Sequence, residues 1–93
     1  MITLTGQLRC TNAQELATVK THLPEHIRLS RAEPGCLSFD VVQTADPMIW
    51  QVDETFTDQT AFDAHQTRTR ASVWYQATAH IARAFQITPS DCG

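Results

Sequence analysis

The chain has 93 residues, 42% of them hydrophobic, which allows one compact domain with a core and excludes a disordered segment. Its formal net charge is −3, from seven basic and ten acidic residues mixed along the chain, so nucleic acid is not an expected partner. The apolar runs are too short to span a membrane, and the N-terminus lacks the features of a secretory signal. We therefore expect a cytoplasmic protein with no membrane partner.

The first segment, residues 2–10, alternates between apolar and polar side chains and predicts a half-buried strand. Its apolar face is interrupted by Gly6, which indicates a bulge or a place where another segment packs closely. Thr11 and Asn12 follow as candidate helix caps, with Gln14 and Glu15 three residues behind them, as in a capping box.

The next segment carries apolar residues at helical spacing and predicts the first helix. These residues are Leu16, Val19, Leu23 and Ile27. Pro24 lies inside the pattern and is expected to kink the helix or split it. Residues 33–35, with the sequence Glu-Pro-Gly, predict the turn that ends it.

Two strands follow, at residues 36–43 and 48–56, joined by a hairpin turn at residues 44–47. In the first of them, Leu37, Phe39 and Val41 share one face. In the second, the corresponding face holds Trp50, Val52, Glu54 and Phe56, so a glutamate interrupts an otherwise apolar surface.

A second helix is predicted from Thr57 or Asp58 onward, with a break near Thr67 and Thr69 and a restart. Its first part contains Ala61, Phe62 and His65, and its second part is expected to turn Val73, Trp74, Ala77 and Ile81 inward. Residues 84–88 predict a short last strand, and residues 89–93 a flexible tail.

The resulting order is β-α-β-β-α-β, the ferredoxin-like α+β arrangement, in one domain spanning residues 1–93. It predicts a four-stranded antiparallel sheet with both helices on one face. The other face has no cover in a monomer, so a homodimer formed by packing two sheets together is expected.

Two short motifs and their spacing resemble the antibiotic biosynthesis monooxygenase (ABM) family. The first is Glu-Pro-Gly-Cys-Leu-Ser-Phe at residues 33–39, and the second is Glu-Thr-Phe-Thr-Asp at residues 54–58, followed by His65. Members of this family are small dimeric α+β barrels that include quinol and anthrone oxygenases. The resemblance covers nearly the whole chain and implies this fold, a dimer and an oxygenase activity.

The chain departs from the family's pattern in two places. Many relatives carry a second histidine five positions after the first, where this chain has Arg70. The haem-degrading branch uses an asparagine on the first strand, a tryptophan and a histidine ligand. Here the first strand offers Gly6 and Gln7, His65 stands at the tryptophan position, and the ligand position falls near Tyr75. Haem binding and degradation are therefore disfavoured.

His65 and Glu54 are the candidate catalytic residues. An imidazole titrates near neutral pH and can accept a proton from a phenolic substrate. A carboxylate on an apolar strand face requires a partner or a raised pKa, so Glu54 is expected to orient His65 or to act as a base. The alternative is structural: a histidine that ties the helix to the sheet, and a glutamate held in an ion pair.

Four aromatic residues are candidates for the lining of a substrate pocket: Trp50, Trp74, Phe39 and Tyr75. Core packing is the alternative for each of them. On a helix, neighbouring residues point about 100° apart, so at most one of Trp74 and Tyr75 is expected to face the pocket.

No metal site is expected. His22 and His26 fall in an H-x-x-E-H pattern, which some zinc peptidases use, but Pro24 disturbs that turn, and we interpret both histidines as lying on a solvated helix end. Cys10, Cys36 and Cys92 form no C-x-x-C pair and are expected to be reduced thiols.

Taken with the resemblance, these residues lead to a first hypothesis of a cofactor-independent monooxygenase that oxidises a small phenolic, quinol or anthrone substrate with molecular oxygen. The second hypothesis is a non-catalytic ligand-binding or stress-related dimer on the same scaffold, because a fold does not fix a function.

Overall fold

The computed structural model describes residues 1–89, and the expectations for Cys92 and the rest of the tail lie outside this range. Its elements follow the predicted order, which confirms the ferredoxin-like α+β class. They are β1 (Ile2–Arg9), α1 (Ala13–Arg31), β2 (Cys36–Gln43), β3 (Ile49–Phe56), α2 (Gln59–Arg70), α3 (Val73–Thr78) and β4 (Ala82–Pro89).

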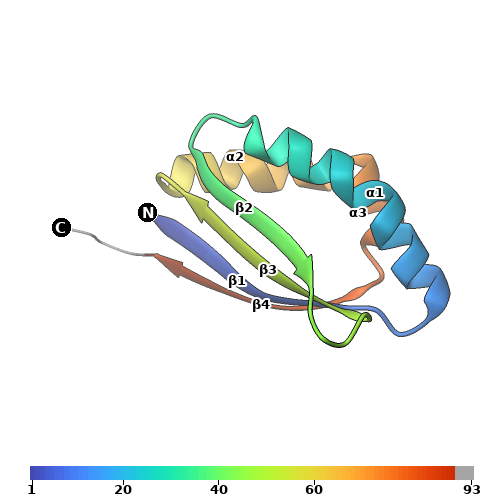
Figure 1. Ribbon diagram of the computed structural model, residues 1–93. Coiled ribbons are helices and arrows are strands. Elements are labelled where there is room, and N and C mark those ends of the chain that lie inside the picture. Colours follow the sequence, from blue (N-terminus) through green and yellow to red (C-terminus); the bar gives the residue numbers. More distant parts are fainter. Residues whose placement is uncertain (90–93) are drawn as a thin grey trace.

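The four strands form one antiparallel sheet in the order β2-β3-β1-β4, and α1 and α2 lie on the same side of it (Figure 1). In the register, Leu4 of β1 stands opposite Glu54 of β3 and Ile87 of β4. These three side chains therefore share the face of the sheet that looks toward the helices. The helices cover the centre of that face but not its β4 edge, where Phe85 and Ile87 stay exposed.

The first helix begins as the capping-box pattern predicts. The Asn12 side chain accepts a hydrogen bond from the Glu15 backbone N–H at 2.8 Å, and a Glu15 carboxylate oxygen accepts one from the Thr11 N–H at 2.7 Å. Val19 and Leu23 of α1 then pack into the core with Leu8 and Phe39 from the sheet. One continuous core thus fixes the helix on the sheet.

Gly6 is a point of close packing, as its position in the sequence indicates. A Cβ atom placed there would come within 2.0 Å of the Ala84 carbonyl oxygen on the neighbouring strand β4. No side chain fits at that separation, so this position requires glycine.

The interior of the fold differs from the sequence expectation at Leu37. Its alternation with Phe39 and Val41 predicts a buried side chain, but 58% of Leu37 is exposed. The register shifts between Cys36 and Ser38, so Leu37 is an extra residue in β2 and leaves the alternation.

Pro24 does not split α1, which runs unbroken from Ala13 to Arg31. Proline removes one backbone donor and frees the carbonyl of Lys20, four residues earlier. Both residues are exposed, so water can satisfy that carbonyl and the helix continues.

The break in the second helix lies at Ala71 and Ser72, a few residues later than predicted. Ser72 caps α3 by accepting a hydrogen bond from the Tyr75 N–H at 3.2 Å. The new cap sets the inward face of α3 at Trp74 and Thr78, so Val73, which the spacing placed inward, is 64% exposed. Ile81 is buried, but it follows the end of α3.

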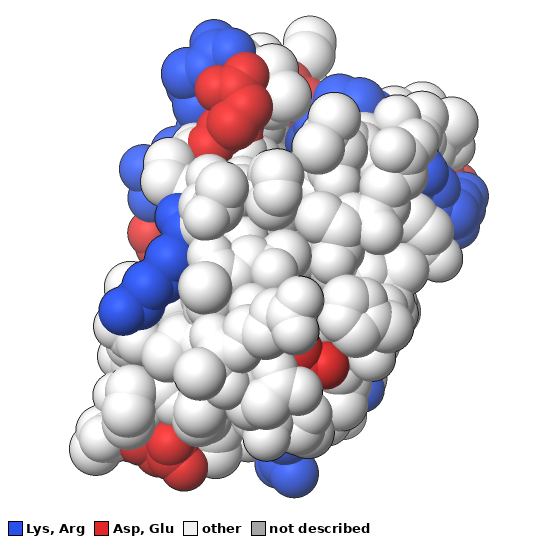
Figure 2. All heavy atoms as spheres, turned by 90° about the vertical axis from the view of Figure 1, so that its right-hand side faces the viewer, with Lys and Arg blue, Asp and Glu red and all other residues white. Residues whose placement is uncertain are grey.

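On one side of the molecule, charged side chains are dispersed rather than gathered into a patch (Figure 2). On the side drawn in Figure 2, acidic and basic side chains are scattered around a large uncharged area, with no broad patch of one sign. Within residues 1–89, no helix is long and apolar enough to cross a membrane.

Candidate functional site

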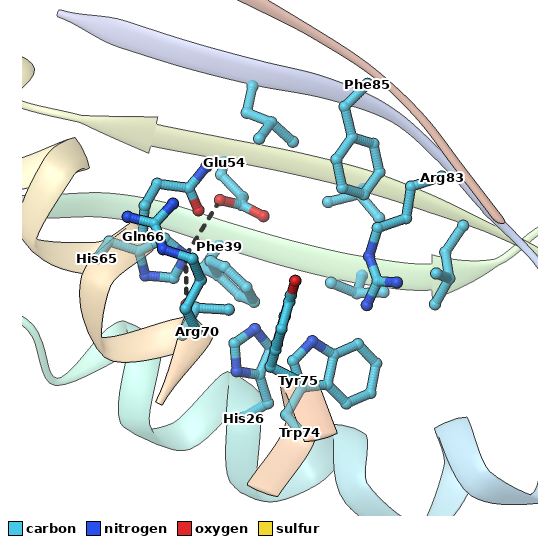
Figure 3. A pocket seen from close by; sticks show the side chains of 15 residues that line it. His26, Phe39, Glu54, His65, Gln66, Arg70, Trp74, Tyr75, Arg83 and Phe85 are labelled. Carbon is cyan, nitrogen blue, oxygen red and sulfur yellow. Dashed lines mark hydrogen bonds and ion pairs between the residues drawn. The ribbon is translucent and has the colours of Figure 1, made fainter. Parts of the chain in front are cut away.

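A cavity of about 250 Å³ lies between the helix-facing side of the sheet and the α2–α3 segment. Figure 3 shows His65 and Glu54 at one side of it, Arg83 and Phe85 at the other, and His26, Trp74 and Tyr75 between them on the helical side. Most of the remaining lining is apolar and comes from the strands: Leu4, Leu8, Phe39, Val41 and Val52. A small, mainly apolar cavity with a few polar groups is typical of a ligand site.

His65 projects from α2 into this cavity and is 98% buried (2% exposed). Its ring packs against Phe56 and Phe39, with ring centroids 4.9 and 5.5 Å away. Its Nδ1 lies 2.9 Å from the Oε1 atom of Glu33, in the turn that follows α1. With a carboxylate as the acceptor, the Nδ1 atom carries the proton, so Nε2 is the basic nitrogen, and the Thr69 hydroxyl lies 3.4 Å from it.

Glu33 is itself held in place. Its Oε1 atom accepts a hydrogen bond from Nε of Arg68 at 2.8 Å, and Nη2 of Arg68 donates to the Ser30 hydroxyl at 2.9 Å. A carboxylate that is positioned by an arginine and in turn orients a histidine is the arrangement that fixes an imidazole for proton transfer. These contacts, from Ser30 through Arg68 and Glu33 to His65, therefore join α1 and α2 to the turn that follows α1.

Glu54 approaches the other nitrogen of the same ring. Its Oε1 lies 3.5 Å from His65 Nε2, and that oxygen is buried with no hydrogen-bond partner among residues 1–89. Burial, together with the smaller effect of the nearby Glu33 charge, raises the pKa of Glu54 to about 8. At neutral pH Glu54 is therefore mainly an uncharged acid.

His65 is neutral for the same physical reason. Burial lowers its pKa below the ordinary value, and the hydrogen bond and charge of Glu33 offset only part of that shift. The site thus places a neutral imidazole beside a protonated carboxyl group. The sequence predicted that Glu54 orients His65 or acts as a base; in the structure Glu33 makes the hydrogen bond to Nδ1, and Glu54 lies beside the opposite nitrogen.

His26 is not on a solvated helix end, contrary to the sequence interpretation. It is 5% exposed, because α1 turns it under the sheet, while His22 is partly exposed one turn earlier. Its ring stacks on Trp74 at 4.9 Å with an interplanar angle of 7° and meets Phe39 edge-on at 5.3 Å. Residues 1–89 contain no group of His, Cys, Asp and Glu side chains able to hold a metal ion.

Arg83 brings a partly buried positive charge to the opposite side of the cavity. Its guanidinium donates to the carbonyl oxygens of Thr78 and Ile81 at 2.7 and 3.0 Å and lies 6.0 Å from the ring centre of Trp74. Burial lowers its pKa. No carboxylate pairs with it in the part of the chain from residue 1 to residue 89.

The four aromatic candidates separate into two groups. Phe39, Trp74 and Tyr75 line the cavity together, whereas Trp50 is buried opposite Leu8, outside it. The expectation that only one of Trp74 and Tyr75 faces the cavity is wrong, because the cavity extends around the short helix α3 and contacts both side chains.

Sequence reasoning missed Glu33, Arg68, His26 and Arg83 as residues of the site. For Glu33 a signal was present, since it opens the Glu-Pro-Gly motif. The other three gave none, because their role depends on how α1, α2 and the β4 edge pack around the cavity.

The family model for antibiotic biosynthesis monooxygenases matches residues 1–84 of the chain. The chain belongs to this family. No curated protein sequence matches the ABM chain.

Solved structures similar to this ABM protein share its fold at low sequence identity. A candidate ABM protein from Deinococcus radiodurans has a TM-score of 0.83 and 18% identity, over 100% of this chain and 95% of that one. Another from Nitrosomonas europaea has a TM-score of 0.80 and 20% identity, over 98% of this chain and 99% of that one. A conserved protein of unknown function from Bacteroides thetaiotaomicron has a TM-score of 0.75 and 16% identity, over 94% of this chain and 92% of that one.

Proposed function

We propose that this ABM protein is a cofactor-independent monooxygenase that oxidises a small phenolic, quinol or anthrone-type molecule with molecular oxygen. The observation that carries the proposal is the pair at one side of the cavity: a neutral imidazole positioned by Glu33, next to the protonated Glu54. Family membership supports a monooxygenase-type activity in general. The cavity supports the choice of a flat aromatic substrate, because Phe39, Trp74 and Tyr75 line it.

The reaction begins with proton removal. His65 takes a proton through Nε2, and the Glu33 carboxylate at 2.9 Å from Nδ1 stabilises the imidazolium that forms. The electron-rich substrate anion then gives one electron to dioxygen, and the two radicals combine to form a carbon–peroxide bond. The apolar lining keeps water away from these reactive species.

The second half of the reaction breaks the O–O bond. The remaining hydrogen on the oxidised carbon leaves as a proton, a carbonyl forms, and the distal oxygen departs as water after protonation. Glu54 is suited to supply that proton, because its pKa of about 8 keeps it protonated at neutral pH. One oxygen atom enters the product and the other becomes water, so the substrate carries all the electrons and no cofactor takes part.

The decisive experiment follows oxygen itself. Purified protein, treated with a chelator, is mixed with quinols and anthrones while oxygen uptake is recorded and the product is analysed by mass spectrometry under ¹⁸O₂. The proposal expects one ¹⁸O atom per product and one dioxygen consumed per substrate. Binding of these compounds without any protein-dependent oxygen uptake would instead establish the alternative, a non-catalytic ligand-binding protein.

We also propose a cytoplasmic homodimer. The sheet face opposite the helices is uncovered, and burying it against a second copy would close a dimeric α+β barrel. The cavity lies on the helical side, so each subunit would hold its own site. Light scattering at micromolar concentration tests this, and a monomer mass throughout that range would contradict it.

A further inference from the structure

The side chain of His26 is a buried polar group without a hydrogen bond. Nδ1 is inaccessible and has no partner; Nε2 also makes no hydrogen bond within residues 1–89 but is not sealed off, so it is the nitrogen that a ligand in the cavity can reach. Buried polar groups in proteins are nearly always paired, since leaving one unpaired is unfavourable. A group left in this state calls for a specific explanation.

The ring cannot turn away to find a partner, because packing fixes its orientation. It is stacked on Trp74 with centroids 4.9 Å apart and meets the edge of Phe39 at 5.3 Å. Within residues 1–89, the charged and titratable groups acting on it are Arg68, His65 and Arg83, which oppose a positive charge on the ring as burial does. The ring is therefore a rigid, neutral imidazole, with one N–H donor and one acceptor nitrogen.

The position of His26 relates it to the proposed chemistry. It lines the same cavity as His65 and Glu54, and the centroids of the two imidazoles are 6.1 Å apart. Figure 3 shows His26 on the helical side of the cavity, next to Tyr75 and Trp74 and apart from the His65–Glu54 pair. One aromatic molecule with two oxygen substituents can thus contact both imidazoles.

We infer that His26 is a substrate-binding residue that recognises a second, uncharged oxygen of the aromatic substrate, a hydroxyl or a carbonyl, and so selects dioxygenated rings over monophenols. The inference rests on the proposed function for its substrate class. An uncharged oxygen matches a neutral imidazole, which can donate to a carbonyl or exchange hydrogen bonds with a hydroxyl. A carboxylate would be better matched by Arg83 at the other side of the cavity.

The contacts around His26 argue against a purely structural role. A histidine kept for structure would bond to a backbone or side-chain group, as His65 does to Glu33. His26 instead offers its surroundings only its ring faces and edge, which a phenylalanine would supply without a buried polar atom. What the imidazole adds beyond a phenyl ring is its two nitrogens.

The test measures binding rather than turnover. Wild type, His26→Phe and His26→Gln are titrated without oxygen against 1,4-dihydroxynaphthalene and against 1-naphthol, and bound ligand is followed by tryptophan fluorescence. Phenylalanine keeps the stacking and removes the nitrogens, whereas glutamine restores a donor and an acceptor. We expect His26→Phe to bind the diol about tenfold more weakly, as for one lost hydrogen bond, with the affinity for 1-naphthol unchanged. His26→Gln should recover part of the preference.

A second readout uses the unmodified protein. In ¹⁵N-labelled wild type, the ring-nitrogen resonances of His26 should shift when the diol binds and stay in place when 1-naphthol binds. An unchanged diol-to-naphthol ratio in His26→Phe, resonances that do not move, or a wild type that binds neither compound would each overturn the inference. If the wild type takes up oxygen but the diol-to-naphthol affinity ratio is the same in His26→Phe, the monooxygenase proposal stands and the role of His26 is refuted. If that ratio changes but the wild type takes up no oxygen, the monooxygenase proposal is refuted and the binding role of His26 stands.

Discussion

The two buried histidines of the cavity differ in the one respect that decides what a histidine can do. His65 has a carboxylate on one nitrogen and its basic lone pair on the other, beside the Thr69 hydroxyl and the Glu54 carboxyl group. It is therefore oriented and can carry a positive charge during a reaction. His26, 6.1 Å away, has no hydrogen bond to any residue from 1 to 89 and is surrounded by rings and positive groups, so its charged form is strongly disfavoured. The same side chain is thus suited to proton transfer in one position and to neutral recognition in the other.

The difference originates in the neighbouring elements rather than in the histidines. Glu33 reaches His65 because the turn after α1 passes beside α2, and Arg68 holds it there. His26 lies two turns earlier on α1, where Trp74 and Phe39 fill the space that a polar partner would need. Four substitutions can break or sharpen this comparison.

Removing the ring of His65 should have the largest effect. We expect His65→Ala to lower kcat by about 10²- to 10⁴-fold on a substrate that the wild type oxidises, which is the usual contribution of a general base. His80→Ala is the matched control, since His80 is 64% exposed in its side chain and outside the cavity. Near wild-type turnover in folded His65→Ala would contradict a catalytic role. A lower melting temperature with unchanged turnover per folded molecule would show that His65 is structural.

The Glu33→Gln variant tests the partner instead of the base. We expect a loss of about 10²-fold in kcat, at the low end of the general-base range, because the imidazolium loses its stabilising charge. Since Glu33 raises the pKa of His65, the acid limb of the kcat/KM profile should move to lower pH. Glu25→Gln, an exposed glutamate paired with Arg28, is the control. An acid limb that stays in place would mean that Glu33 does not act through His65.

The Glu54→Gln variant should change how stability depends on pH. Between about pH 4.5 and pH 8 the unfolded chain ionises this group while the folded protein keeps it protonated. The unfolded state then binds fewer protons, so the free energy of unfolding falls as pH rises through this window. We expect the glutamine variant to lack this loss. The loss is worth about 1.4 kcal/mol for each unit by which the pKa of Glu54 in the folded protein exceeds its value in the unfolded chain. Urea unfolding at pH 5, 7 and 9 measures it, and parallel curves for the two proteins would refute the raised pKa.

The smallest effect is expected for His26→Phe under mild acid. Folding lowers the pKa of His26 from 6.5 to about 3, so below pH 6.5 the unfolded chain binds a proton that the folded protein refuses. The free energy of unfolding of the wild type therefore falls as pH drops from 6.5 toward 3. His26→Phe should lose less stability between pH 6.5 and pH 5 than wild type, whereas His22→Phe on the same helix should follow wild type. Equal losses in all three proteins would contradict the burial of a neutral His26.

The amino-acid sequence by itself determined the order of elements, the apolar faces of β1 and β3 and the start of α1. These features depend on local alternation, helical spacing and caps, which act between residues close in the chain. It also placed Glu54 on the buried face of β3 and His65 on the inward side of α2, because the strand and helix periods fix those directions.

Only the tertiary structure decided how these residues meet. A bulge exposes Leu37, and the cap at Ser72 turns Val73 outward. Each displaces the strand or helix pattern by one or a few residues, which the spacing of apolar residues in the sequence does not reveal. The pairing of His65 with Glu33, in addition to Glu54, joins residues 32 positions apart. The burial of His26 depends on Trp74 stacking on it from a helix that begins 47 residues later. Contacts of this kind arise from packing between distant elements, and no local pattern in the sequence encodes them.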